Sequence, residues 1–175
     1  MAIFRFLFVS MCALLFCPGC GSVQKPPSVV GSIDLQRYSG TWYEIARYPN
    51  RFEKGCEGVT ATYRMVEDGS LEVINRCRRA DSEGSVSEIK GRAKVHDEQS
   101  PAKFKVTFFW PFYGHYWIID LADDYSWAVI GHPRRKYLWI LARQAHLEKD
   151  VLQKILLRIV VQGYDPERLI YPKQP

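Results

Sequence analysis

The stretch Gly40-Thr41-Trp42-Tyr43-Glu44-Ile45-Ala46-Arg47 is the first of eight short runs that are rich in Val, Ile, Tyr, Phe, Trp and Thr. β-Branched and aromatic residues favour extended strands. Turn-forming residues separate the runs, and many short strands at such spacing are typical of an all-β sandwich or barrel. We expect strands at residues 40–47, 59–66, 71–78, 86–95, 103–110, 116–121, 127–131 and 137–143.

Short turns join these runs, so consecutive strands should lie side by side and antiparallel. Eight strands in up-and-down order can close on themselves and remove the free edges of the sheet. The period then changes, because residues 146–162 carry apolar side chains at helical spacing and Gly163 follows as a C-cap. We therefore predict an all-β, eight-stranded antiparallel up-and-down β-barrel, with a C-terminal α-helix packed on its outside and a last short strand at 168–171.

The hairpin registers predict which side chains face inward, since directly paired residues share a face. With Arg143 placed inward, the predicted pairs are Trp139–Ile130, Leu141–Ala128, Ala128–Ile119, Ile130–Trp117, Trp117–Phe108, Ile119–Val106, Val73–Tyr63 and Asn75–Ala61. The predicted inner face consists of Tyr63, Val73, Asn75, Val106, Phe108, Trp110, Trp117, Ile119, Ile130, Trp139 and Leu141. A barrel of this size is either filled by its side chains or holds one small ligand, and both alternatives stay open at this point.

The N-terminal region predicts an export signal. Arg5 precedes an uncharged apolar run at 6–16, and small residues follow. The run is too short for a membrane-spanning helix, which needs about 20 apolar residues, and the order is typical of a secretory signal. We assign residues 1–19 to a lipoprotein signal peptide, 20–32 to a flexible tether and 33–175 to the folded domain.

Cys20 is the predicted site of lipidation. Small residues flank it on both sides, and the segment resembles a bacterial lipobox, in which the Cys becomes the first residue and carries acyl chains. The match departs from the pattern at Cys17, where an aliphatic residue is usual. Ordinary signal cleavage near Ser22 is the alternative.

The chain has five Cys, and three of them belong to the N-terminal region. Removal of the leader and acylation of Cys20 leave Cys56 and Cys77, in a compartment that permits disulfides. We predict that these two residues form a disulfide, with two free thiols as the alternative. In ideal register Cys77 faces Val59, so a bend is needed to bring the two sulfur atoms within bonding distance.

Three short elements carry a family resemblance. Gly40-Thr41-Trp42, Asp124-Tyr125 and Arg143 occur in the order of the three lipocalin signatures and are followed by the predicted helix. Together with the lipobox-like Cys20, the chain resembles the lipocalin family and especially the bacterial outer-membrane lipoprotein lipocalins, relatives of apolipoprotein D. The resemblance implies that Gly40, Trp42 and Arg143 close one end of the barrel, with the Arg143 guanidinium stacked on the Trp42 ring. An anion-anchoring role for Arg143 is the alternative.

The resemblance implies a carrier of fatty acids or lysophospholipids. Such a protein would be held by its N-terminal lipid anchor on the periplasmic face of the outer membrane and would serve lipid storage, transfer, maintenance or repair. An apolar interior fits an acyl chain, and cationic groups near the mouth fit a headgroup. The expected headgroup residues are Arg51, Lys54, Arg76 and Arg78, with a merely solvated charge cluster as the alternative.

Composition and motifs exclude several other classes. The chain has 175 residues, enough for one domain, and its 47% apolar and 25% charged content argues against disorder and against a multi-span membrane protein. The net charge of +5 is not concentrated, so we expect no nucleic-acid partner. The four His are scattered without metal-ligand spacing, and we expect no metal, no cofactor and no catalytic residues.

The inward Glu44 is the one carboxylate that could act as a buried acid, and a structural role is the alternative. A lipid-processing enzyme on the same barrel and an envelope interaction module with a filled core are the competing functions. A homodimer is also left open.

Overall fold

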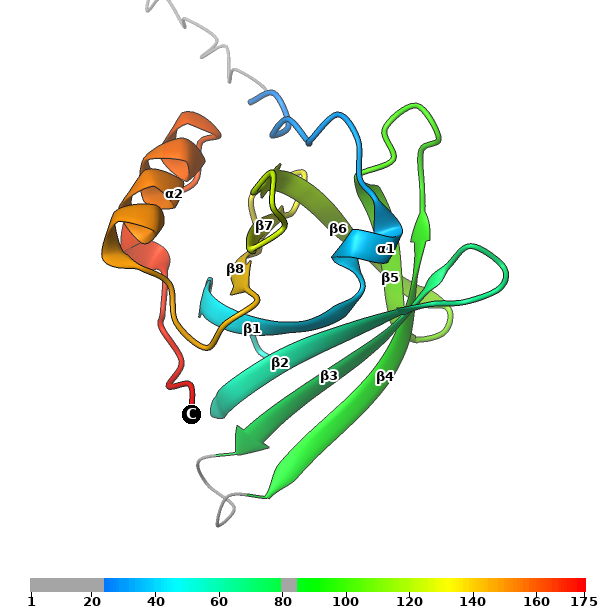
Figure 1. Ribbon diagram of the computed structural model, residues 1–175, viewed down its shortest axis with the longest axis horizontal. Helices are drawn as coiled ribbons and strands as arrows, with labels where there is room; N and C mark the ends of the chain where they lie inside the picture. The colour runs from blue at the N-terminus through cyan, green and yellow to red at the C-terminus, as the bar shows by residue number, and fades with distance from the viewer. Residues whose placement is uncertain (1–23, 80–84) are drawn as a thin grey trace, which may run out of the picture.

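The computed structural model describes residues 24–79 and 85–175, and these residues form a closed barrel (Figure 1). The strands are β1 (Gly40–Arg47), β2 (Cys56–Met65), β3 (Leu71–Arg79), β4 (Val86–Val95), β5 (Lys103–Phe109), β6 (Phe112–Leu121), β7 (Trp127–Gly131) and β8 (Leu138–Ala142). The helices are α1 (Leu35–Tyr38), α2 (Lys149–Val161) and the short 3-10 helix η1 (Pro166–Arg168). Each strand pairs antiparallel with the next and β1 also pairs with β8, so the predicted eight-stranded up-and-down barrel is confirmed.

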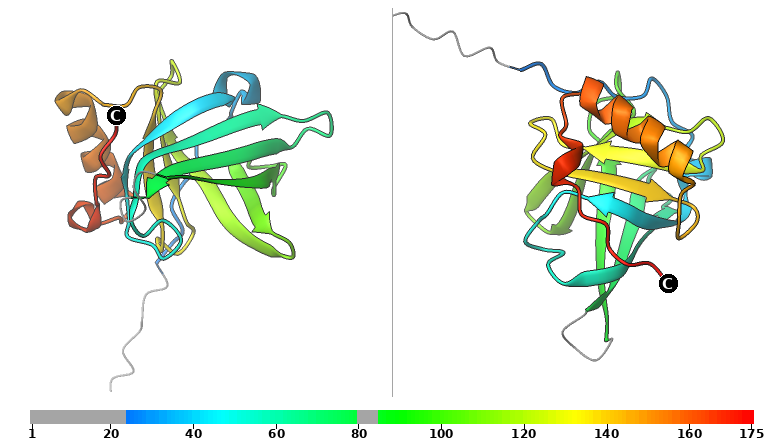
Figure 2. Two further views of the ribbon diagram at one scale, coloured as in Figure 1. Left: turned by 90° about the horizontal axis from the view of Figure 1, so that it is seen from below. Right: turned by 90° about the vertical axis from the view of Figure 1, so that its left-hand side faces the viewer.

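Helix α2 packs on the outside of the barrel, as predicted, and lies across β7, β8 and β1 (Figure 2). Ile155 and Ile159 on its inner stripe are buried among outward-facing residues of these strands, including Ile140. The predicted strand at 168–171 is reduced to one bridge, between Arg47 and Ile170. Among the residues that the structure describes, no helix is long and apolar enough to span a bilayer.

The three signature elements meet at one end of the barrel, which we call the closed end. Trp42 is fully buried there, and its indole nitrogen donates to the carbonyl of Tyr38 at 2.8 Å. The Arg143 guanidinium lies 3.8 Å from the centre of the Trp42 ring, which confirms the predicted stacking. Arg143 also donates to the Thr41 carbonyl at 3.1 Å and to the Tyr125 carbonyl at 3.4 Å. These contacts give Arg143 a structural role at the base of the barrel.

Gly40 is required by this arrangement. Its φ of +98° lies in the region that favours glycine, and an added Cβ would stand 3.3 Å from a guanidinium nitrogen of Arg143. The short helix α1, which the sequence pattern did not predict, caps the same end. Its N-cap Asp34 accepts from the backbone nitrogens of Gln36 and Arg37 at 2.9 and 3.1 Å.

The N-terminal segment lies against the barrel in the part that the structure describes. The predicted leader and Cys20 lie outside the described residues, but the described part of the expected flexible tether is docked on the barrel. Ser28 donates from its backbone to the side chain of Gln162 at 2.9 Å, and the Val30 nitrogen donates to the Ile118 carbonyl at 3.0 Å. Pro27 is buried. Proline and valine side chains thus bury apolar surface in a segment whose small residues suggested flexibility.

The register of β6 differs from the expected one. The turn between β5 and β6 is Trp110-Pro111 rather than the predicted segment 111–114, and Val106 pairs with Gly114 instead of Ile119. A one-residue change of register moves a side chain to the other face. Trp117 and Ile119 therefore face outward and belong to the cluster under α2, whereas Tyr116 and Ile118 face inward.

Bulges cause this change of face, because the compact turn alone would shift the pairing by an even number of positions and keep the predicted faces. Register shifts occur in β5–β6 between Val106 and Phe109, and in β6–β7 between Ile118 and Asp120, so that Ile130 pairs with Ile118 rather than with Trp117. The predicted pairs in β2–β3 and β7–β8 are confirmed, including Tyr63 with Val73 and Trp139 with Ile130.

Cys56 and Cys77 form the predicted disulfide, with their Cα atoms 5.3 Å apart. The necessary bend is a bulge in β2 between Glu57 and Thr60.

We predict that the Cys56→Ser/Cys77→Ser double variant loses about 3 kcal/mol of unfolding free energy, because the bond closes a loop with a sequence separation of 21. Urea unfolding with and without reductant tests this. Equal stability of the variant and the oxidised protein would contradict it.

A second prediction concerns the closed end. The Trp42→Ala variant should lose about 3–5 kcal/mol of unfolding free energy, because it leaves a cavity under Arg143. Trp110→Ala is the matched control: Trp110 is exposed, so its loss should cost less than about 0.5 kcal/mol. Urea titrations of both variants decide the point. A mild effect at Trp42 would show that this ring does not hold the base together.

Candidate functional site

The inner face of the barrel is the candidate site. Of the residues predicted to line it, the following belong to the inner cluster: Tyr63, Val73, Val106, Phe108, Ile130, Trp139 and Leu141. Sequence reasoning missed Tyr38, Phe104, Tyr116 and Ile118, which belong to the same cluster. Tyr116 and Ile118 were missed because bulges in the β5–β6 and β6–β7 pairings shift the register by one residue. The compact Trp110-Pro111 turn would not have found them, because without the bulge it would pair Val106 with His115 and keep Trp117 on the inner face. Trp110, expected inside, is an exposed turn residue.

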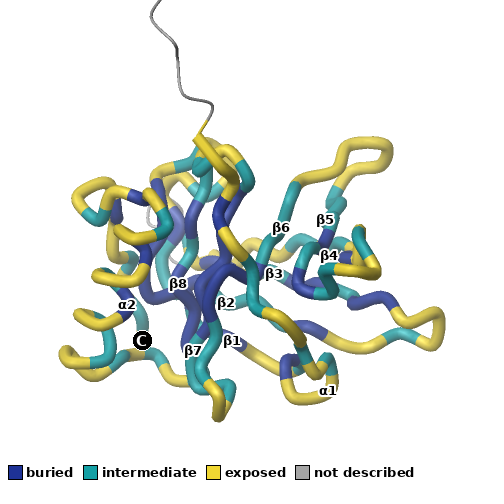
Figure 3. The backbone as a smooth tube through the Cα atoms, turned by 90° about the horizontal axis from the view of Figure 1, so that it is seen from above, coloured by how far each residue is buried: buried dark blue, intermediate teal, exposed yellow. Residues whose placement is uncertain are grey.

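The inner face is sealed at the closed end and less buried toward the other end, which we call the mouth. Trp42 and Val73 are buried, whereas the inward-facing side chains of Val106, Phe108 and Trp139 are only half-buried. Figure 3 shows the buried residues concentrated where β1, β7 and β8 meet, and mostly intermediate or exposed residues along β4, β5 and β6. Solvent therefore reaches apolar side chains of the inner face.

Gly91 makes room for one of these rings. A Cβ at this position would stand 2.6 Å from the ring of Phe108 and 2.5 Å from the Thr107 carbonyl oxygen. Gly91 pairs with the inward-facing Val73. The missing side chain on β4 thus allows the Phe108 ring of β5 to lie over the strand, inside the barrel.

Three tyrosines form a chain of hydroxyl groups in the interior. The Tyr116 hydroxyl lies 2.6 Å from that of Tyr38 and 2.8 Å from that of Tyr63. Burial raises the pKa of all three phenols above the ordinary value, so each keeps its proton at neutral pH. The chain satisfies these hydroxyl groups within an otherwise apolar region.

A cluster of charged side chains lies nearer the mouth. A bulge in β1 between Glu44 and Ala46 places Arg47 opposite Trp139 on β8. Because Trp139 faces inward and directly paired residues share a face, Arg47 faces inward as well. Arg47 forms a buried ion pair with Glu44, donates to the Glu53 carbonyl at 2.9 Å, and places its Nε 3.7 Å from the Glu53 carboxylate. The Trp139 indole donates to that same carboxylate at 3.1 Å.

These contacts fix the β1–β2 loop against the barrel wall. The alternation of residues predicted the inward position of Glu44 but not that of Arg47, since only the bulge brings Arg47 to the inner face. Burial, with a further contribution from the negative charge of Glu53, raises the pKa of Glu44 to about 8, and Arg47 opposes this rise.

Asn75 brings a polar group to the inner face. It pairs with Ala61 and follows the inward Val73 at the strand period. Its side-chain oxygen is buried and accepts no hydrogen bond within the described part of the protein. This acceptor is available to a hydrogen-bond donor on a molecule inside the barrel.

The predicted headgroup residues do not form one cluster. Arg51 and Lys54 are exposed on the β1–β2 loop at the mouth. Arg76 lies on the outer face, where it donates to Glu88 at 2.7 Å, and Arg78 shares that face. The strand period explains the difference, because both alternate with the inward Asn75 and Cys77.

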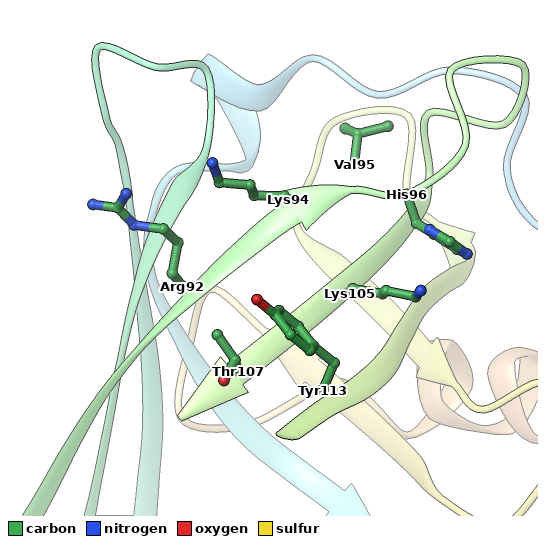
Figure 4. Close-up of a pocket in the computed structure, with 7 residues that line it drawn as sticks. All are labelled: Arg92, Lys94, Val95, His96, Lys105, Thr107 and Tyr113. Carbon is green, nitrogen blue, oxygen red and sulfur yellow. The ribbon is translucent and has the colours of Figure 1, made fainter. Parts of the chain in front are cut away.

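A separate hollow of about 200 Å³ lies on the outer wall, over β4, β5 and β6 (Figure 4). Its lining includes Arg92, Lys94, Lys105 and Tyr113. Arg92 and Lys94 extend to Asp68, at 3.3 and 3.1 Å, so their charges are partly neutralised. Across residues 24–79 and 85–175, no group of three or more His, Cys, Asp or Glu side chains is placed to hold a metal ion.

Glu44 gives a testable pH dependence. The folded protein holds this proton more tightly than the unfolded chain, whose glutamate has an ordinary pKa of 4.5, so the stabilisation is complete below that pH and is lost as the pH rises through about 8. Glu44→Gln imitates the protonated acid and lacks this loss. The unfolding free energy of the variant minus that of the wild type should therefore rise between about pH 5 and about pH 8, by up to about 1.4 kcal/mol per pH unit.

Urea unfolding of both proteins over this range measures the difference. Burial and nearby positive charges lower the pKa of His132 to about 4, and because both proteins contain this residue its effect cancels in the comparison. Parallel pH profiles would contradict the assignment of the proton to Glu44.

Comparison with known proteins agrees with this architecture. The chain is 42% identical over 158 residues to outer membrane lipoprotein Blc of Escherichia coli strain K12, covering 89% of each chain. It is 36% identical over 171 residues to the protein of the same name from Vibrio cholerae, covering 97% of this chain and 99% of the relative. Apolipoprotein D of Macaca fascicularis is 39% identical over 149 residues, covering 78% of this chain and 75% of the relative.

Solved structures show the same fold at lower identity. Insecticyanin from the tobacco hornworm Manduca sexta superposes with a TM-score of 0.67 at 22% identity, covering 86% of this chain and 84% of that one. A family model described as a lipocalin-like domain matches residues 33–174, which include the whole barrel and helix α2. The closed barrel, its sealed base and these matches together show that the chain belongs to the lipocalin family.

Proposed function

We propose that this protein binds lipids with a single acyl chain, fatty acids or lysophospholipids, inside its barrel. The observation that carries the proposal is the set of inward apolar side chains that solvent reaches from the mouth, above all Val106, Phe108 and Trp139. A filled core would bury these groups. An apolar site closed at its base and open at one end fits a chain with a polar head.

The interior suggests how such a lipid would lie. Its acyl chain would contact the half-buried aromatic and aliphatic side chains, while its head would stay near the mouth, where Arg51 and Lys54 are exposed. The carbonyl oxygen of the Asn75 side chain would accept a hydrogen bond from a hydroxyl group of the lipid. Arg76 contributes less, because Glu88 holds it on the outer wall.

The cellular role in the proposal follows the relatives named outer membrane lipoprotein. We propose that Cys20 carries the lipid anchor and that the protein faces the periplasm, where it stores, transfers, maintains or repairs membrane lipid.

The competing enzyme function finds less support in the interior. Glu44, the one carboxylate that alternation marked as a buried acid, accepts a buried hydrogen bond from Arg47, which also donates to the Glu53 carbonyl of the β1–β2 loop. This arrangement favours a structural role for Glu44. A homodimer stays a prediction, and sedimentation of the purified protein would decide it.

Neighbouring positions on β5 give a matched test. Val106 faces inward, and the neighbouring Lys105 faces outward, where it lines the hollow on the outer wall. Val106→Asp should weaken the binding of palmitoyl lysophosphatidylethanolamine by about tenfold or more, because an acyl chain would then have to lie against a desolvated charge. Lys105→Asp should leave binding within about twofold, since its carboxylate stays on the outer wall beside the cationic Arg92 and Lys94. Displacement of a fluorescent fatty acid measures both affinities, and circular dichroism checks the fold.

Equal loss of binding in the two variants would point to a site on the outer wall or to general damage. Binding that is unaffected by Val106→Asp would contradict the interior site. Release of a fatty acid from the lysophospholipid by the wild-type protein would favour the enzyme instead.

A further inference from the structure

The hairpin between β5 and β6 ends in exposed aromatic rings. Phe109, Trp110, Phe112 and Tyr113 are 69%, 81%, 77% and 57% exposed, and we call these four residues the aromatic tip. Figure 3 shows the hairpin projecting from the barrel as exposed backbone. Large apolar side chains gathered in this way mark an interaction site on a soluble domain.

The aromatic tip lies at the mouth, as the antiparallel topology requires. The ends of β1, β3, β5 and β7 and the starts of the strands that follow them share one end of the barrel. Phe52 on the β1–β2 loop and Val86 at the start of β4 are 62% and 68% exposed at the same end. Apolar groups from three connections therefore surround the opening to the interior.

The same end carries exposed positive charge. Arg51 and Lys54 lie on the β1–β2 loop, and Arg134 and Lys136 lie on the β7–β8 loop. Residues 132–137 include no acidic residue. Glu53, the acidic residue within 48–55, is engaged by Arg47, Asn50 and Trp139. The mouth thus combines projecting aromatic rings with basic side chains.

This combination identifies the partner as a lipid surface. Tyr and Trp rings favour the membrane–water interface, and basic side chains near a surface of anionic lipids each contribute about 1 kcal/mol to binding. The tip is a projecting hairpin, with Phe109 paired to Phe112 across it. A projecting apolar group enters the loosely packed interface of a bilayer readily, whereas a protein partner would need a fitted pocket for it.

We propose that the mouth docks on a bilayer containing anionic phospholipids, with the aromatic tip inserted in the interface and Arg51, Lys54, Arg134 and Lys136 against the headgroups. The opening of the barrel then faces the lipid. A single-chain lipid can pass between bilayer and interior without crossing water. The docking stands on the surface residues alone, while this passage rests on the proposed function.

Brominated lipids test the insertion, because bromine quenches the fluorescence of a Trp that enters the acyl region. The full chain is reconstituted in vesicles of phosphatidylethanolamine and phosphatidylglycerol with brominated acyl chains. The difference between the wild type and Trp110→Phe isolates the signal of Trp110. We expect strong quenching of this signal and severalfold less quenching in vesicles of phosphatidylcholine alone.

The variants separate the tip from other exposed apolar surface. Phe109→Ser/Phe112→Ser should reduce the ratio of inserted to free tip more than about tenfold. The matched control is Leu157→Ser/Val161→Ser on α2, which removes side chains that are 69% and 89% exposed and should change nothing. Arg134→Gln/Lys136→Gln should reduce the ratio about fivefold for each charge removed.

The outcomes are decisive in both directions. Absence of quenching at Trp110, or equal effects of the tip and α2 variants, would overturn the docking. A dimer seen by sedimentation that depends on the tip and forms in place of insertion would assign the surface to a second copy of the chain.

Binding of monomeric lysophospholipid without vesicles should be normal in Phe109→Ser/Phe112→Ser, and its loss would place the tip in the ligand site instead. The quenching of Trp110 should be the same in Val106→Asp as in the wild type, even if this variant no longer binds lipid in its interior.

Discussion

Closure of the sheet between β1 and β8 is the constraint on which the rest of the structure depends. Strand β1 is hydrogen-bonded to β2 on one side and to β8 on the other, so no strand of the ring can shift without breaking pairs on both sides. This fixed register assigns every side chain to the interior or to the outer wall. At the base, Trp42 fills the interior and Arg143 covers its ring, which leaves the mouth as the open end.

The interior is apolar but not uniformly so, and its polar groups have different roles. The hydroxyl chain through Tyr116 satisfies its own members. The pairing of Arg47 with Glu44 and Glu53 holds the β1–β2 loop, and through Trp139 it joins that loop to β8. Buried ion pairs add little net stability but strongly disfavour alternative arrangements that would leave one charge unpaired. The cluster therefore specifies the shape of the mouth more than it stabilises the barrel.

Sequence reasoning predicted the elements that depend on strong local patterns. β1, β4 and β7 were predicted with their observed bounds, and helix α2 within a few residues, because strand alternation, turn residues and helical spacing are local signals. The face assignments were correct where a hairpin has a regular register, as for Tyr63 with Val73. Trp117 and Ile119 were assigned to the wrong face because two bulges, which shift the register by one residue, are set by pairing across strands. The same limit hid Arg47, which a bulge turns inward.

The proposed site for a single-chain lipid is the mouth-facing apolar wall of the barrel interior. Native mass spectrometry of the protein extracted from its own membrane tests it most directly. We expect a population of protein carrying one fatty acid or lysophospholipid, released on denaturation and displaced by added lipid of the same class. Protein that is free of lipid, and stays so after incubation with either class, would rule out this interior site.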